Sequence, residues 1–200
     1  MGALHQILLG LGGTAAGVGL PVSDDFNRAD NASSLGTATS GHVWTALGGT
    51  WGISSNKAHI SNATGLKPAY VECGAADVSV QATLNKTDAS NNLNRIGIAF
   101  RISDASNFLY AYYLTSTGLR LFKLVAGVNT QIGTATVTGT NNDVLKVVTS
   151  GDQIEVYQNG VLKIGPITET HNQTATKHGL FFEVGGSSFT LCRWDDFSIV

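Results

Sequence analysis

Charge is scarce in this chain of 200 residues. Charged side chains make up 13% of the sequence, and 12 Lys and Arg against 14 Asp and Glu leave a formal net charge of −2. Proteins that bind nucleic acid electrostatically gather basic side chains against the phosphates. The sequence contains no such cluster, so we expect no nucleic-acid partner.

Strong helix formers are also scarce. The chain has one Met and only four Glu beside ten Asp, whereas Gly and Thr are abundant. Gly and Thr disfavour helices, and Thr favours strands. Three Pro are too few for a Pro-rich linker, and a hydrophobic content of 42% is too high for a disordered chain. The composition therefore predicts one folded domain that is rich in β-structure.

Only two cysteines are present, Cys73 and Cys192. Their separation fits neither a zinc-site spacing nor a disulfide-dense scaffold. We expect both to be buried core thiols, with a disulfide between them as the alternative. No cofactor is expected from the motifs in the chain.

The first 21 residues differ from the rest. They hold no Lys or Arg and one compact cluster of large apolar side chains, namely Ile7, Leu8, Leu9 and Leu11. A secretory signal would need a positive leading segment and a clear cleavage site, and a membrane span needs about 20 consecutive apolar residues. We therefore predict an N-terminal arm over residues 1–21 and a single domain over residues 22–200. The arm either anchors the chain to a neighbouring subunit, in a trimer or larger homo-oligomer, or folds back on its own domain.

Alternating apolar and polar residues dominate the chain after residue 76. The dipeptide Asn159-Gly160 lies between two alternating runs and predicts a type I′ hairpin. Trp44 and Trp51 are expected in the core, with a turn at Gly48-Gly49. Short strands separated by turns every 8–12 residues or so are typical of an all-β, two-sheet antiparallel jelly-roll sandwich. We expect strands over residues 77–84, 95–102, 108–114, 119–125, 130–138, 144–149, 153–158, 161–164, 178–184 and 188–200.

One order of residues resembles a known family. The run begins with Phe100-Arg101, Asp104, Asn107 and Tyr110-x-Tyr112, and continues with Leu119-x-Leu121-x-Lys123, Gly127, Leu145-Lys-Val-Val148, Gly151 and Ile154-x-Val156-Tyr157-x-Asn159-Gly160. It is similar to the concanavalin A-like lectin/glucanase sandwich, close to the laminin G-like branch, and covers residues 23–200. The resemblance implies that the first and last strands of the domain meet.

A second resemblance concerns the start of the chain. The segment from Asp24 to Ala58 resembles domains of phage tail and virion-surface proteins, and the opening HQILLGLGG resembles the short leads of phage particle proteins. It implies a structural protein on the virion surface, as a head decoration or a minor tail or fibre protein. Such a protein would contact other virion proteins through the arm and either contact host-surface glycan or reinforce the particle. The alternative is a free non-catalytic carbohydrate-binding module or adhesin domain.

The carboxylates do not form a catalytic pattern. The glucanases of the resembling superfamily use a Glu-x-Asp-x-x-Glu motif, and retaining hydrolysis needs two carboxyl groups about 5–5.5 Å apart. Adjacent Asp pairs on a strand point to opposite faces. We therefore expect no enzymatic activity, since the four Glu fall on four separate predicted segments: Glu72, Glu155, Glu169 and Glu183.

Candidate sugar-binding residues follow from the expected strand faces. The even-numbered residues of 96–102 are expected to fill the space between the sheets, which places Arg101 on the outer, concave face. Tyr113 on the neighbouring strand could then stack on a sugar ring, and Arg120 is a further candidate. The structural alternatives are that Arg101 pairs with Asp104 and that Tyr113 packs under a loop.

Calcium is the metal that the resemblance suggests, because lectin-like sandwiches often bind it near sheet edges. Asp25 and Asp196 would converge if the first and last strands pair. Calcium takes six to eight oxygen ligands. The alternative is that these acids accept hydrogen bonds from backbone amides in turns.

Overall fold

The computed structural model of the protein describes residues 19–86, 94–114, 118–185 and 192–200. The four apolar arm residues Ile7, Leu8, Leu9 and Leu11 lie outside the described residues. The described residues form strands and turns without an α-helix. Accordingly, no helix among them is long and apolar enough to cross a membrane.

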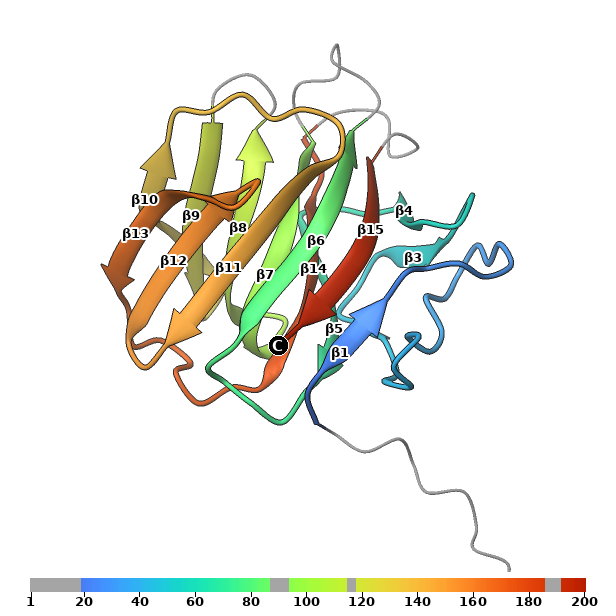
Figure 1. The fold of residues 1–200 in the computed structure, drawn as a ribbon, viewed down its shortest axis with the longest axis horizontal. Helices are drawn as coiled ribbons and strands as arrows, with labels where there is room; N and C mark the ends of the chain where they lie inside the picture. Colours follow the sequence, from blue (N-terminus) through green and yellow to red (C-terminus); the bar gives the residue numbers. More distant parts are fainter. Residues whose placement is uncertain (1–18, 87–93, 115–117, 186–191) are drawn as a thin grey trace, which may run out of the picture.

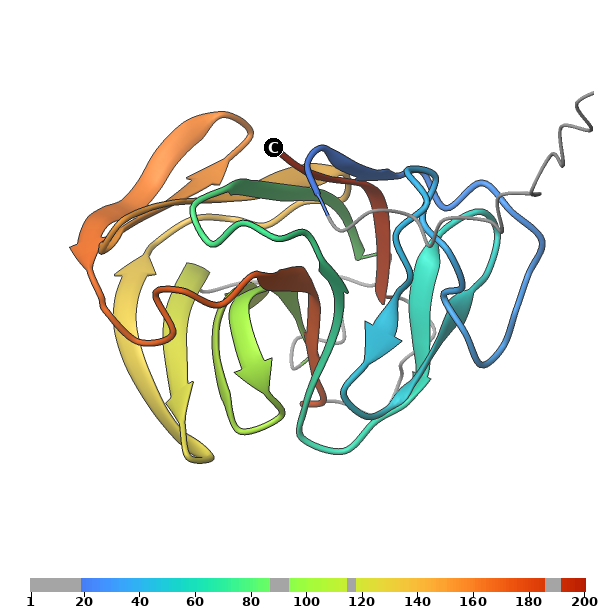
Figure 2. The same cartoon turned by 90° about the horizontal axis from the view of Figure 1, so that it is seen from below.

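Two antiparallel sheets pack face to face, as Figures 1 and 2 show. The first has the strand order β13-β12-β11-β6-β15-β4-β3, with β1 also paired to β15. Its strands are β1 (Val22–Asp24), β3 (Thr50–Ile53), β4 (Ala58–Asn62), β6 (Ser79–Lys86), β11 (Asp143–Ser150), β12 (Gln153–Gln158), β13 (Val161–Thr168) and β15 (Cys192–Ile199).

The second sheet has seven strands in the order β10-β9-β8-β7-β14-β5-β2. The two-sheet antiparallel sandwich predicted from the sequence is therefore confirmed. The strands of this sheet are β2 (Thr45–Ala46), β5 (Leu66–Glu72), β7 (Arg95–Asp104), β8 (Asn107–Leu114), β9 (Gly118–Val125), β10 (Val128–Ala135) and β14 (Lys177–Glu183).

The core lies between the sheets and takes alternate residues from most of the longer strands. Trp51 packs against Trp194 with ring centroids 5.0 Å apart, and Trp44 packs against Phe197 at 4.9 Å. Both predicted core tryptophans are buried. Burial of aromatic side chains contributes a large share of the energy of such cores.

Both cysteines are buried and they do not form a disulfide with each other, so the disulfide alternative is wrong. Cys73 directly follows β5, and its thiol lies 3.3 Å from the carbonyl oxygens of Ala75 and Thr176. Burial raises the pKa of the Cys73 thiol. Cys192 begins β15. Each thiol therefore behaves as a small core side chain.

Two predicted local features are also confirmed. Asn159 and Gly160 both have positive φ, 51° and 78°, which the type I′ turn between β12 and β13 requires. The first and last strands pair, with Val22 opposite Ile199 in the register of β1 and β15. The two ends of the domain therefore lie side by side in the first sheet.

Candidate functional site

A second apolar cluster covers the face of the seven-stranded sheet that points away from the core. Its rings come from β8, β9 and β14. A sheet face outside the core of an antiparallel sandwich is usually polar. We call this set the outer aromatic cluster; it consists of Phe108, Tyr110, Tyr112, Phe122 and Phe181.

Four rings of the cluster lie nearly parallel to one another, whereas the Phe108 ring is tilted by 51° against Tyr110 and by 52° against Phe181. Tyr110 and Phe181 have centroids 4.2 Å apart and planes at 21°, and Tyr110 and Phe122 have centroids 5.5 Å apart and planes at 13°. Tyr112 stacks on the same group, 5.9 Å from Tyr110. Offset stacking of this kind stabilises aromatic pairs beyond the area they bury.

Small residues on the neighbouring strand make room for these rings. Gly97 lies in register between Phe181 of β14 and Tyr112 of β8. A Cβ on Gly97 would lie 1.9 Å from the carbonyl oxygen of Ala111, so this position requires glycine. Ala99 occupies the equivalent place beside Tyr110. Because Gly97 and Ala99 are small, the rings from the neighbouring strands β8 and β14 can meet above β7.

Exposure within the cluster is graded. Phe108 and Phe181 are fully buried, while Phe122 at one side and Tyr70 of β5 at the other are partly exposed. Burial raises the pKa of Tyr110, whose hydroxyl donates to Asn129 Oδ1 at 2.8 Å. The phenol of Tyr110 therefore stays a hydrogen-bond donor at neutral pH. Solvent reaches the cluster only at its margin, which is formed by Phe122 and Tyr70.

Charged side chains surround this margin. Arg95 Nη1 lies 2.5 Å from Glu183 Oε1, and the Arg95 guanidinium lies 5.6 Å from the centre of the Tyr112 ring. Lys177 Nζ lies 5.3 Å from the centre of the Tyr70 ring. Cations at such distances are attracted to the ring faces. The site thus combines apolar ring surface with donors at its rim.

Arg120, the third sugar-binding candidate, lies on the outer face of β9. Its neighbours Leu119 and Leu121 belong to the inner core, which leaves Arg120 and Phe122 on the opposite side. Arg120 Nη1 donates to the Thr134 hydroxyl of β10. This candidate remains accessible, since both Arg120 and Thr134 contact solvent.

The predicted outer position of Arg101 is wrong. A bulge interrupts the pairing of β7 and β8 between Phe100 and Asp104, and Arg101 has a φ of +47°. An extra residue reverses the alternation of faces beyond it. Arg101 therefore turns toward the other sheet and is fully buried, while Ile102 joins the outer cluster.

Tyr113 was also expected on the outer face, and that position is wrong as well. Tyr110 and Tyr112 occupy the outer face of β8, so the alternation turns Tyr113 into the inner core, where it is 3% exposed. Its hydroxyl has no hydrogen-bond partner among the described residues. In this position Tyr113 cannot stack on a sugar, because the packed sheets cover its ring.

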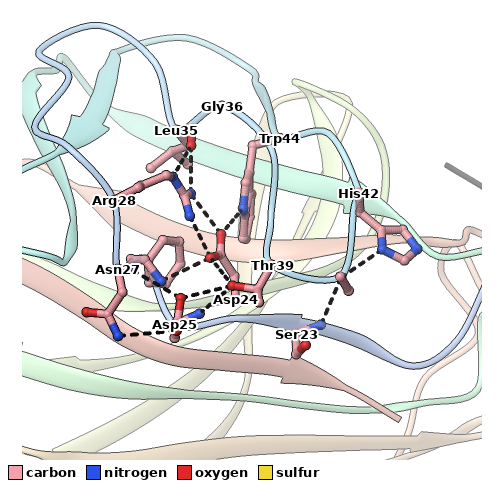
Figure 3. Close-up of polar contacts among 12 residues, drawn as sticks. Ser23, Asp24, Asp25, Asn27, Arg28, Leu35, Gly36, Thr39, His42 and Trp44 are labelled. Atoms are coloured by element: carbon pink, nitrogen blue, oxygen red, sulfur yellow. Dashed lines mark hydrogen bonds and ion pairs between the residues drawn. The ribbon is translucent and has the colours of Figure 1, made fainter. Parts of the chain in front are cut away.

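A polar network surrounds the buried carboxylate of Asp24 in β1, where the chain enters the first sheet (Figure 3). Asp24 is 1% exposed and accepts two hydrogen bonds from Arg28, at 2.7 and 2.9 Å. Trp44 Nε1 donates to Asp24 at 2.7 Å, and the amide of Phe26 donates at 3.0 Å. Arg28 also donates to the Leu35 carbonyl. The network ties β1 to the segment that leads to β2.

The predicted calcium residues Asp25 and Asp196 line one pocket, of about 240 Å³. The oxygens of Asp25 accept hydrogen bonds from the Asn27 amide, the Asn27 side chain and the Thr39 hydroxyl. These bonds, led by the Asn27 amide, lower the pKa of Asp25. Within the described ranges no three His, Cys, Asp or Glu side chains form a metal-binding group. Asp25 therefore takes part in a turn, as the structural alternative proposed, and calcium at this pair stays a prediction.

The sequence reasoning placed none of the five residues of the outer aromatic cluster in a binding site, and it missed Tyr70 at the side of the cluster as well. The sequence signal that could have found them is the alternation of side chains between the two faces of a strand. Phe122 lies two residues beyond Arg120, and Phe181 alternates with Leu180 and Phe182. The face to which each alternation belonged could not be assigned without the pairing of the strands.

The fold is that of the concanavalin A-like lectins and glucanases. No protein-family model and no curated protein matches the chain. Among solved structures, the chain is similar to the carbohydrate binding module CBM66 from Bacillus subtilis. The two share 20% identity, the alignment covers 78% of this chain and 90% of that one, and the TM-score is 0.56.

Two other structures show the range of proteins built on this fold. The carbohydrate recognition domain of Emp47p has 8% identity and a TM-score of 0.59, over 90% of this chain and 92% of that one. A β-glucanase from Bacillus licheniformis has 14% identity and a TM-score of 0.51, over 92% and 99%. At these identities the likeness concerns the fold alone, which serves both binding proteins and enzymes.

Proposed function

We propose that this protein is a non-catalytic glycan-binding domain that contacts sugar with the margin of the outer aromatic cluster. The observation behind this proposal is an aromatic cluster with a charged rim on a sheet face outside the core. Sugar rings offer C–H surfaces that pack on aromatic rings and hydroxyls that bond to polar side chains. Phe122 and Arg120 provide this pair of features side by side on β9.

The structural neighbours support the proposal without deciding it. A carbohydrate binding module and a carbohydrate recognition domain share the fold. We expect weak, roughly millimolar affinity for a single glycan, because few polar groups converge on the margin and the accessible area is small.

The acids of the outer face support binding rather than hydrolysis. Glu72 and Glu183 are the described carboxylates on the outer faces of β5 and β14. Glu72 lies opposite Lys177, six residues along β14 from Glu183, so the two acids are about 20 Å apart. Retaining and inverting glycosidases both hold their carboxyl groups within about 10 Å. Release of reducing sugar that depends on either Glu would overturn the non-catalytic part of the proposal.

A glycan array followed by calorimetric titration tests the binding site. Phe122→Ala should weaken binding of any glycan that the array selects by at least tenfold, because it removes the exposed ring. Tyr157→Ala is the matched control, since Tyr157 is an aromatic residue on the outer face of the other sheet. Equal losses in both variants, or no loss in Phe122→Ala, would reject the outer aromatic cluster as the site.

A place on a phage virion is the finer part of the proposal and rests on the resemblance of the opening HQILLGLGG and of the segment from Asp24 to Ala58 to phage particle proteins. A chain that begins at Ser23 should fold as a soluble monomer and fail to join a particle or oligomer. Normal assembly of the shortened chain, measured by light scattering, would remove the arm as an anchor.

A further inference from the structure

Arg120 differs from the other cations on the outer face of the seven-stranded sheet. Arg95 forms an ion pair with Glu183, and Lys177 lies opposite Glu72 in the register of β14 and β5. None of the ion pairs formed among the described residues includes Arg120. The bond from its Nη1 goes to a neutral hydroxyl, that of Thr134.

The charges of this face therefore do not cancel. Arg95, Lys177 and Arg120 are its described cations, and Glu72 and Glu183 its described anions. The excess positive charge belongs to Arg120, at the accessible margin of the cluster. A ligand that binds there with an anionic group would complete the pairing that the protein leaves open.

Building on the proposed glycan-binding function, we propose that the ligand is an acidic glycan. A sugar ring packs on Phe122, and its carboxylate binds the guanidinium of Arg120. Residues two apart on one strand share a face and are separated by about 7 Å, so a ring on Phe122 places a ring substituent within reach of Arg120. A planar guanidinium can bind a carboxylate through two parallel hydrogen bonds.

Arg95 and Tyr112 support this placement from the other side. Tyr112 lies directly opposite Arg120 in the register of β8 and β9. Arg95 lies two strands from Arg120, about 10 Å across the sheet, and its guanidinium lies over the same Tyr112 ring. The Nε of Arg95 is buried and has no hydrogen-bond partner among the described residues. Arg95 thus contacts the Tyr112 ring while its charge is paired with Glu183, and the unpaired positive charge at the margin is that of Arg120.

The test uses the full chain and an array of uronate- and sialate-bearing oligosaccharides, each printed beside its methyl ester. Esterification removes the charge of the sugar and keeps its shape. We expect the acid of a selected pair to bind at least fivefold more tightly than its ester at low salt. The difference should shrink as salt increases, because ions screen the interaction at an exposed site.

Variants assign the effect to its residue. Arg120→Gln should abolish the preference for the acid over the ester, while Lys146→Gln, which removes a cation from the other sheet, should keep it. Equal binding of acid and ester overturns this inference and leaves the proposed function standing. A preference for the acid that persists in Arg120→Gln overturns the assignment to Arg120. An array with no binding at all, acidic or neutral, removes the proposed function itself.

Discussion

The side chain of Arg101 reaches from one sheet to the other and bonds to Asp77. Arg101 Nη2 donates to Asp77 Oδ1 at 3.0 Å and to the carbonyl oxygen of Gly151 at 2.6 Å. Arg101 belongs to β7, whereas Asp77 precedes β6 and Gly151 lies in the turn between β11 and β12. The guanidinium is fully buried, and its Nε and Nη1 have no partner among the described residues. This contact fastens the two layers at one end of the sandwich.

Replacement of Arg101 should therefore affect stability. Arg101→Ala leaves a cavity and two lost hydrogen bonds, and should lower the free energy of unfolding by about 2–4 kcal/mol. Arg101→Met fills most of the volume without a buried charge and should cost less. Urea denaturation measures both. If the Ala variant is as stable as the parent protein, the contact does not fasten the layers. Glycan binding should be the same in all three proteins.

The buried carboxylate of Asp24 should contribute much more to the free energy of unfolding than the exposed carboxylate of Asp25. Asp24→Asn keeps the shape of the side chain but removes the charge that pairs with Arg28, and should cost about 2–4 kcal/mol. Asp25→Asn is the matched control, because Asp25 is exposed and bonds within a turn, and its effect should be small. Thermal unfolding compares the two. Similar losses would mean that the Trp44 and Arg28 contacts of Asp24 are not stabilising.

His178 should make the protein sensitive to mild acid. Burial lowers the pKa of His178 to about 4; its Nδ1 accepts from the Arg101 amide and its Nε2 lies 3.0 Å from the Ala75 carbonyl. The unfolded chain binds a proton to this residue near pH 6.5, and the folded chain does not. Stability should therefore fall as the pH decreases from about 6.5 to 4, by about 3 kcal/mol in total.

The variant His178→Gln keeps one donor and one acceptor but does not titrate in this range. Its unfolding free energy should change less between pH 7 and pH 4 than that of the parent protein. His59, whose pKa is also lowered, chiefly by burial, remains in both proteins and cancels in the comparison. Parallel pH profiles for the two proteins would exclude His178 as the sensitive group.

Gly97 should tolerate no side chain. A methyl group there would meet the Ala111 carbonyl at 1.9 Å and Tyr112 Cα at 2.7 Å, so both β7 and β8 would have to move. We expect Gly97→Ala to lose about 3 kcal/mol and to weaken glycan binding by disturbing Tyr112. Gly19→Ala, where nothing lies within 4 Å of the added atom, is the control. A stable Gly97→Ala variant would contradict the close approach of the two strands.

The two thiols should be protected in the native protein. Cys73 and Cys192 are buried and not joined in a disulfide, and the thiolate needed for reaction is disfavoured at Cys73 by burial. An aromatic disulfide reagent should label them slowly in buffer and label two per chain in denaturant. Fewer than two thiols in denaturant would indicate a disulfide, and rapid labelling in buffer would contradict their burial.

Local patterns in the sequence were sufficient for most of the strands. The alternation in β7 and β12, the aromatic run of β8 and the Asn159-Gly160 turn depend on neighbours along the chain, which the sequence displays directly. The faces of the strands were harder to assign, because a single bulge at Arg101 reverses the side on which later residues lie. The outer aromatic cluster also depends on the pairing of β14 with β7, which are far apart in the sequence, and no local pattern encodes that register.

The pairing of β1 with β15 also determines how this domain can be carried by something larger. The first described strand and the C-terminal strand lie next to each other in the eight-stranded sheet, and Figure 1 shows the C-terminus beside β1. The margin with Arg120 and Phe122 belongs to the opposite layer. A tether at either end, or insertion of the whole domain into a loop of another protein, would therefore attach the sandwich through its eight-stranded sheet and leave the margin where we propose that glycan binds on the opposite side.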